Sequence, residues 1–542
     1  MRKSSKKKIY EAGNTKGGFL SGVLLLSGST VIVKIIGLAY KIPMLNRLGT
    51  AGMGYFNSAY EIYAILCMVA TAGLPVALSM MIATAREQQK SETIRRIDRV
   101  FTLLFCVLGV IGCIGLFVFS RGLSFAVGNR EAYLCILAIA PSFPFACYSG
   151  SVRGYFQGLH RMAPTAISQL LEACGKLLFG VLFADMALRR NLSLPWVAAY
   201  AMLGVSVGTL MSAVYLFLAK HSIHKEEKRD LLPERYKKIL KDAAQISVPI
   251  TVGALLISST KLLDTSMMIR RLQGIGYTAY EANELYGAYT TLAVPVFGLI
   301  PSLISPISLV LIPKLTSAME QRDRKREAEL SEESIRLTVL FSMPASLGVV
   351  LFSKPILQLL FGGQSSAVEQ AFPMLSILGG AILFSGMITT TNAILQAYRH
   401  PMLPILSMAV GVLVKGFFAY WLMGIPEIGA LGAPISTFLC NVTVTVLNLY
   451  FLRKSVPEGE SPRGMLELYA KPLLASSASM LTAALVYRTV EGLESATALP
   501  LLSAILTGVL LYGLLALWMG MITEEDLSLL PFYKIKMKKK YH

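Results

Sequence analysis

Long apolar stretches recur along the whole chain, and they constrain its fold more than any other feature. A membrane-spanning helix needs about 20 mostly apolar residues. Candidate stretches lie near residues 20–45, 57–83, 100–120, 131–152, 164–187, 195–219, 245–270, 285–312, 335–353, 371–397, 402–423, 428–452, 470–490 and 498–521. The chain is therefore predicted to be an all-α integral membrane protein with about fourteen transmembrane helices, because lipid cannot satisfy the backbone of irregular segments.

Composition and charge agree with a membrane protein. Only 15% of the residues are charged, whereas soluble domains carry roughly 25%. The net charge of +19 would suggest nucleic acid as the partner of a soluble chain. Here the basic residues lie between apolar stretches, so no nucleic-acid partner is expected, and anionic membrane lipids are the expected partners instead.

The distribution of basic residues predicts the orientation of the chain. Of the 51 lysines and arginines, 37 fall in segments that lie on one side if the spans alternate from an inside N-terminus. Nine fall in the opposite connections. Basic loops stay on the cytoplasmic side of membranes, so both termini are predicted to be cytoplasmic.

An internal repeat divides the chain. Gln157 and Gln396, Ser168 and Ser407, and Lys176 and Lys415 are pairs separated by the same offset of 239 residues. The repeat predicts two six-helix lobes that enter the membrane from the same side, related by a pseudo-twofold axis along the membrane normal. Transporters built from such repeats bind their substrate between the two halves.

The predicted domain organisation follows from the spans and the repeat. A basic cytoplasmic tail (1–19) precedes the N-terminal lobe (20–222). A cytoplasmic linker (223–244) then leads to the C-terminal lobe (245–453). Two extra helices (454–521) and a second basic cytoplasmic tail (522–542) follow.

Charged residues inside the predicted spans are the candidate site. A charge at the middle of a bilayer costs at least ~2.5–3.5 kcal/mol, so such residues usually face a wet cavity. Spans 1 and 7 are equivalent in the repeat, and both carry lysines. Together with neighbouring charges they could line a cationic cavity suited to phosphate or pyrophosphate, formed by Lys34, Lys41, Glu61, Lys261, Asp264, Arg270 and Arg271.

Structural roles for the same residues stay open. Lys34 could form an ion pair with Glu61, and Lys261 could neutralise Asp264 one helical turn away. Lys41 and the two arginines could extend towards the membrane surface. The pair formed by Glu172 and Lys176 is interpreted as structural.

Prolines mark two spans at equivalent positions of the repeat. Pro75 lies in the second span, and Pro295 and Pro301 lie in the eighth. Proline removes a backbone hydrogen bond and kinks a helix. These residues are therefore candidates for a gating or hinge role.

The sequence offers no chemistry of bond formation. It contains no GxxxxGK[ST] motif for a nucleotide, no GxSxG motif, and no HExxH or Cys/His cluster for a metal. We expect no catalytic residues, no metal site and no cofactor, and hence not an enzyme. A coupling ion, sodium or proton, is possible.

Nine segments carry a resemblance to a known family. They are 34–43, 48–55, 59–63 and 72–79 near the N-terminus, and 247–253, 262–264, 270–273, 284–287 and 311–315 further along. In their order and spacing they resemble the SpoVB/MurJ-like polysaccharide flippases of the multidrug/oligosaccharidyl-lipid/polysaccharide exporter superfamily. The resemblance covers essentially the whole chain. It implies two lobes around a cationic cavity, a groove near spans 13 and 14 for a lipid tail, and a location in the bacterial cytoplasmic membrane. Lys34 matches a basic position of the family's first span, with lysine where arginine is common.

The resemblance also implies a function. Such proteins flip lipid II, an undecaprenyl-pyrophosphate peptidoglycan precursor, and some are linked to the spore cortex. The expected partners are a lipid-linked oligosaccharide and cell-wall synthesis proteins. The alternatives are a MATE-like cation or drug antiporter, a membrane enzyme, and a non-transporting scaffold for cell-wall synthesis or sporulation.

Overall fold

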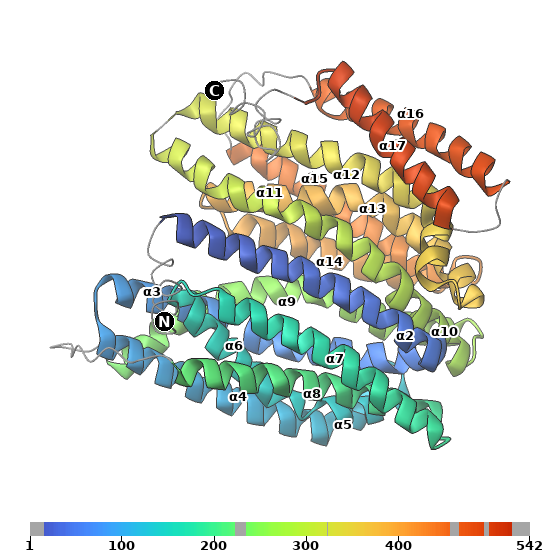
Figure 1. Cartoon of the computed structure of the whole chain (residues 1–542). Helices are drawn as coiled ribbons and strands as arrows, with labels where there is room; N and C mark the ends of the chain where they lie inside the picture. The colour runs from blue at the N-terminus through green and yellow to red at the C-terminus, as the bar shows by residue number, and fades with distance from the viewer. Residues whose placement is uncertain (1–15, 223–234, 322, 456–464, 493–497, 523–542) are drawn as a thin grey trace, which may run out of the picture. The chain divides into compact units, whose positions relative to one another are not determined.

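The computed structural model describes residues 16–222, 235–321, 323–455, 465–492 and 498–522 (Figure 1). Within these ranges all of the regular secondary structure is helical. The all-α architecture predicted from the apolar stretches is therefore confirmed. Most of both predicted basic tails, and residues 223–234 of the predicted linker, lie outside the described residues.

The described chain divides into two compact units. The first is formed by residues Met1–Thr291 and Val412–Ser436. It holds α2 (Lys16–Thr71), α3 (Gly73–Glu87), α4 (Ser91–Ala126), the 3-10 helix η1 (Arg130–Ala132), α5 (Tyr133–Ile139), α6 (Ser142–Gly158), α7 (Ala163–Arg189), α8 (Leu194–His221), α9 (Tyr236–Gly274), α10 (Ala279–Ala288) and the 3-10 helix η3 (Gly429–Leu431).

The second unit is formed by residues Leu292–Gly411 and Thr437–His542. It holds α11 (Val294–Glu320), α12 (Arg324–Phe361), α13 (Ser365–Ala397), α16 (Met465–Glu491) and α17 (Ala498–Trp518). The π-helical turn η2 (Tyr289–Ala293), α14 (Met402–Leu422) and α15 (Gly432–Ser455) contribute residues to both units. The predicted lobes at 20–222 and 245–453 stay a prediction, because a division by packing does not test the repeat.

The described helices include twelve candidate membrane spans, or up to thirteen if the bent pair Arg130–Ile139 and Ser142–Gly158 is one span. The two parts of this pair meet at 50°. Twelve or more spans make this a multi-pass membrane protein, while the predicted number of fourteen is not confirmed. One of these candidate spans, Gly28–Glu87, is a helical segment of 60 residues. At 1.5 Å per residue such a helix would be far longer than the ~30 Å hydrocarbon core.

Gly49 interrupts this long helical segment. Its φ of 62° and ψ of −179° lie outside the helical region and in one that favours glycine. In Figure 1 the dark-blue beginning of α2 runs to one end of the helix bundle, and the lighter-blue continuation returns from there. A reversal at Gly49 supports two spans in place of one.

Glycines allow α7 and α8 to pack at very short range. A Cβ atom on Gly208 would lie 2.7 Å from the backbone oxygen of Glu172, and one on Gly204 would collide with the backbone of Gly180. Small residues spaced by four bring membrane helices together in this way, since lipid provides no hydrophobic drive for helix association. The Gly204–Gly208 spacing therefore sets the α7–α8 contact.

The outer surface is rich in large apolar side chains, as expected for contact with lipid. Leu103, Val118, Leu413 and Phe417 are each about two-thirds exposed or more. All three tryptophans are also exposed, and they lie at or near helix ends, at Trp196 of α8, Trp421 of α14 and Trp518 of α17. Tryptophan is enriched where membrane meets water, so these residues mark candidate membrane boundaries.

Candidate substrate-binding site

A cluster of lysines links α2 to α9 within the first unit. Lys34 and Lys261 are exposed, whereas Lys41 is partly buried. The charge of Lys261 acts on both Lys34 and Lys41, and the carboxylate of Glu61 acts on Lys41. Three lysines and one glutamate leave this cluster with a net positive charge. Basic residues of α2 and α9, which hold the two spans that the predicted repeat pairs, therefore lie within electrostatic reach of one another.

The π-helical turn before α11 provides a partner for Lys41. The Lys41 Nζ donates a hydrogen bond of 2.6 Å to the backbone carbonyl of Thr290. In a π turn this carbonyl would accept from the N–H of residue 295, and residue 295 is a proline with no N–H to give. The side chain of Asn57 supports the same turn, because its Nδ2 donates to Thr290 Oγ1 at 2.9 Å and to Thr291 Oγ1 at 2.8 Å.

Asp264 pairs with a lysine from a different helix. Its Oδ2 accepts hydrogen bonds from Lys415 Nζ of α14 at 2.8 Å and from the Tyr289 hydroxyl at 3.2 Å. Both partners of the ion pair are buried, with 6% of Asp264 and 2% of Lys415 exposed. The pair therefore joins α9 to α14, and the one-turn pairing of Asp264 with Lys261 is not the ion pair that forms.

Arg270 and Arg271 lie at the far end of α9, about 14 Å along the helix from Lys261. Arg270 Nη2 donates to the backbone carbonyl of Phe125 at 2.7 Å. The Arg271 guanidinium lies over the Tyr420 ring, 4.1 Å from its centroid. These contacts anchor the end of α9 to α4 and α14. A role of the two arginines in binding a substrate stays a prediction.

The candidate hinge prolines lie beside breaks in the helices. The helical segment breaks at Ala72, and Pro75 is the third residue of α3. Pro295 is the second residue of α11 and directly follows the π-helical turn, and Pro301 lies two turns further on. The second and eighth predicted spans are thus both interrupted next to a proline. Whether they move stays a prediction.

Sequence reasoning missed two sets of contacts. The predicted Glu172–Lys176 pair is present at 2.6 Å, but Arg153 of α6 also binds Glu172, at 2.8 Å. The partner of Lys415 lies on another helix, so spacing within one helix could not reveal it. The sequence held one clue to this pair. Lys415 lies 239 residues after Lys176, and this offset marked it as the predicted equivalent of a lysine that pairs with an acid.

No group of three or more histidine, cysteine, aspartate or glutamate side chains that could hold a metal ion occurs among the described residues.

Solved structures define the class of this fold. The structure of "Lipid II flippase MurJ, inward closed conformation" matches with a TM-score of 0.68 and 15% identity, covering 91% of this chain and 98% of that one. An "Inward-facing conformation of a multidrug resistance MATE family transporter of the MOP superfamily" matches with a TM-score of 0.64 and 14% identity, covering 80% of this chain and 98% of that one. The chain has the fold of these membrane transporters.

The particular family is shown by sequence. The profile described as "Polysaccharide biosynthesis protein" matches residues 19–319, more than half of the chain, and the MatE profile matches residues 286–421. The chain therefore belongs to the polysaccharide biosynthesis protein family, and the resemblance seen in the sequence is confirmed.

Curated relatives extend over most of the chain. In Bacillus subtilis (strain 168), the "Uncharacterized membrane protein YabM" is 27% identical over 94% of each chain. The "Stage V sporulation protein B" of the same organism is 24% identical over 82% of this chain and 85% of its own. The "Lipid II flippase MurJ" of Bacillus subtilis (strain 168) is 24% identical over 73% of this chain and 76% of its own.

Proposed function

We propose that this protein is a flippase for an undecaprenyl-pyrophosphate-linked cell-wall precursor, with lipid II as the first candidate. The substrate would pass from the inner to the outer leaflet of the bacterial cytoplasmic membrane by alternating access. Both termini would lie in the cytoplasm.

The observation that carries this proposal is the lysine cluster of α2 and α9. The charge of Lys261 acts on Lys34 and on Lys41, although like charges repel and all three lie within candidate membrane spans. Such an arrangement is costly unless an anion offsets it. A pyrophosphate is an anion of the right chemistry for a group of lysines, and it is the charged part of lipid-linked cell-wall precursors.

The matched family and the curated relatives support the same function. The profile that matches is described as a polysaccharide biosynthesis protein. One relative is named a lipid II flippase and another a sporulation protein. The substrate could therefore be lipid II of the vegetative wall or a related precursor used in sporulation.

A second candidate is a MATE-like antiporter of cations or drugs. The MatE match at residues 286–421 and the buried carboxylate of Asp264 favour it. The cluster of basic residues argues against it, because a cationic substrate would be repelled by Lys34, Lys41 and Lys261.

The test is transbilayer movement of lipid II in proteoliposomes that contain the purified protein. We expect wild-type protein to move lipid II and Lys34→Gln to move it about tenfold more slowly, since a charge-assisted hydrogen bond to pyrophosphate is lost. Lys34→Arg should retain the activity. Lys90→Gln, which removes a lysine from the connection between α3 and α4, is the matched control and should leave the rate unchanged.

The outcomes separate the two candidates. Movement of another pyrophosphate-linked glycan but not of lipid II would contradict lipid II as the substrate. It would still support the flippase mechanism. Export of a cationic drug without movement of any anionic lipid would favour the antiporter.

A further inference from the structure

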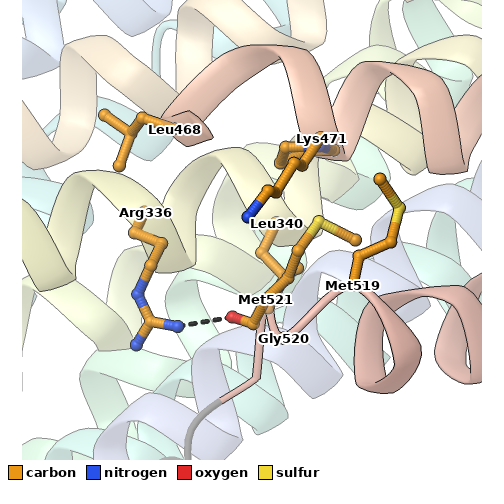
Figure 2. Close-up of a pocket in the computed structure, with 8 residues that line it drawn as sticks. Arg336, Leu340, Leu468, Lys471, Met519, Gly520 and Met521 are labelled. Carbon is orange, nitrogen blue, oxygen red and sulfur yellow. Dashed lines mark hydrogen bonds between the residues drawn. The ribbon is translucent and has the colours of Figure 1, made fainter. Parts of the chain in front are cut away.

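Cationic side chains bind backbone carbonyls at the ends of helices in this structure. Arg270 donates to the carbonyl of Phe125, in the last turn of α4. Arg336 of α12 donates to the carbonyl of Met521, just beyond the end of α17, and this hydrogen bond is drawn in Figure 2. The last carbonyls of a helix have no partner within it, so basic side chains commonly cap them.

The carbonyl that Lys41 binds lies in the middle of a span instead. Thr290 is the twelfth residue of the 26-residue candidate span Ala279–Ile304. A carbonyl at such a place normally accepts from an N–H of the following turn, and Pro295 has no N–H to give. Lys41 of α2 therefore supplies, from another helix, the hydrogen bond that Pro295 removes from this one.

Asn57 of α2 holds the same π-helical turn. Only 6% of Asn57 is exposed, and its Nδ2 donates to the hydroxyls of Thr290 and Thr291. Just before the turn, α10 packs closely on α2, because a Cβ atom on Gly287 would collide with the backbone of Thr50. The turn is thus anchored to α2, and the first stretch of the first unit ends inside it, at Thr291.

Lys41 also belongs to the lysine cluster. Its charge lies within electrostatic reach of Lys261 and of Glu61. One ammonium is therefore shared between the candidate binding site and the broken helix. A pyrophosphate carries full negative charge, whereas a carbonyl is a neutral dipole, so the anion attracts an ammonium more strongly at equal distance. An anion in the cluster would compete with Thr290 for Lys41.

We propose that Lys41 and Asn57 form a latch on the π-helical turn, and that an anion bound at the lysine cluster opens it by drawing the Lys41 ammonium away from Thr290. Opening would let the turn change its backbone geometry, and with it the direction in which the chain enters α11. A ligand shifts an equilibrium only by its difference in affinity for the two states, and the released Lys41 provides that difference. Opening of the latch rests on the proposed function, because it requires a pyrophosphate at the cluster.

The experiment is hydrogen–deuterium exchange of the full-length protein in detergent, measured by mass spectrometry at the amides of residues 289–294. The probe is undecaprenyl pyrophosphate, and its binding is measured separately by native mass spectrometry. In the wild type we expect the probe to raise the exchange rate of the turn about tenfold, the effect of losing one charge-assisted hydrogen bond. Lys41→Met should exchange about tenfold faster without the probe and show no further rise with it.

Two variants separate the latch from the charge of the cluster. Lys34→Met removes a charge from the same cluster and leaves the bond between Lys41 and Thr290 in place, so without the probe it should exchange like the wild type. Pro295→Ala returns an N–H to the turn, so the Thr290 carbonyl no longer depends on Lys41. In Pro295→Ala the probe should change the exchange rate less than about twofold.

Equal exchange by the wild type and Lys41→Met without the probe would overturn the latch. An equal rise in Lys34→Met would also overturn it, since the turn would then respond to the charge of the cluster and not to the hydrogen bond. Binding of the probe without faster exchange at the turn would overturn the latch and leave the flippase proposal intact. Failure of the wild type to bind the probe would contradict both, and the separate binding measurement distinguishes this case.

Discussion

At the scale of single residues, the lysines and arginines of α9 have different surroundings. Lys261 is exposed and interacts electrostatically with Lys34 and Lys41. Arg270, at the end of the same helix, already donates to the carbonyl of Phe125. A bound anion would therefore gain more from Lys261 than from Arg270.

This difference predicts the order of two transport defects. Lys261→Gln should slow lipid II movement in proteoliposomes about tenfold, whereas Arg270→Gln should slow it less than about threefold. Protein of each variant is first matched for thermal stability. Equal defects, or a larger one at Arg270, would show that the substrate contacts the end of α9 instead of the lysine cluster.

The buried pair of Asp264 and Lys415 predicts a strong effect on stability. Lys415→Met leaves the Asp264 carboxylate buried without its ion-pair partner, which costs about 3–5 kcal/mol. Adding Asp264→Leu removes that charge and should recover most of the loss. The measurement is the free energy of unfolding in detergent, from denaturant titration. A double variant as unstable as the single one would show that the pair itself stabilises the fold. Lys454→Met serves as a control for the loss of an exposed lysine.

At the scale of helices, glycine decides how closely α7 and α8 approach. Gly204→Leu would place a side chain against the backbone of Gly180, so the helices must separate. We expect the free energy of unfolding to fall by about 3 kcal/mol or more, beyond the usual range for surface substitutions. Gly115→Leu is the matched control, because a Cβ atom there meets nothing within 4 Å. An equal loss at both positions would contradict a packing role for Gly204.

Broken helices are the second feature at this scale. The π-helical turn at Tyr289–Ala293 exposes a carbonyl that Lys41 uses, and Pro295 explains why the helix does not continue regularly through it. The same proline pattern was visible in the sequence. The π turn was not, because its geometry depends on the contacts that Lys41 and Asn57 make from α2.

At the scale of the whole molecule, orientation follows from the basic residues and can be measured directly. We expect green fluorescent protein fused to either terminus to fluoresce in bacterial cells and alkaline phosphatase fused at the same positions to be inactive, since both ends are predicted to be cytoplasmic. Active phosphatase at one terminus only would imply an odd number of spans. Active phosphatase at both would reverse the orientation.

Hydropathy was sufficient to predict the fold class, and the search for charges inside the predicted spans was sufficient to single out Lys34 and Lys261 as candidates. The details that the sequence could not supply depend on tertiary contacts. Residues 131–152 are predicted to be one span, and the sequence gives no sign of the 50° bend between α5 and α6 within it. The Lys415–Asp264 pair joins residues far apart in the sequence, so no local pattern could identify it.

The exposure of all three tryptophans has a consequence for spectroscopy. Trp196, Trp421 and Trp518 are 47%, 57% and 83% exposed, so the intrinsic fluorescence of this protein reports on its surroundings more than on its interior. Lipids brominated at different depths of their chains should quench this emission strongly. A shift of the emission maximum on transfer from detergent to bilayer would then measure insertion, and it should not be taken as a change of fold.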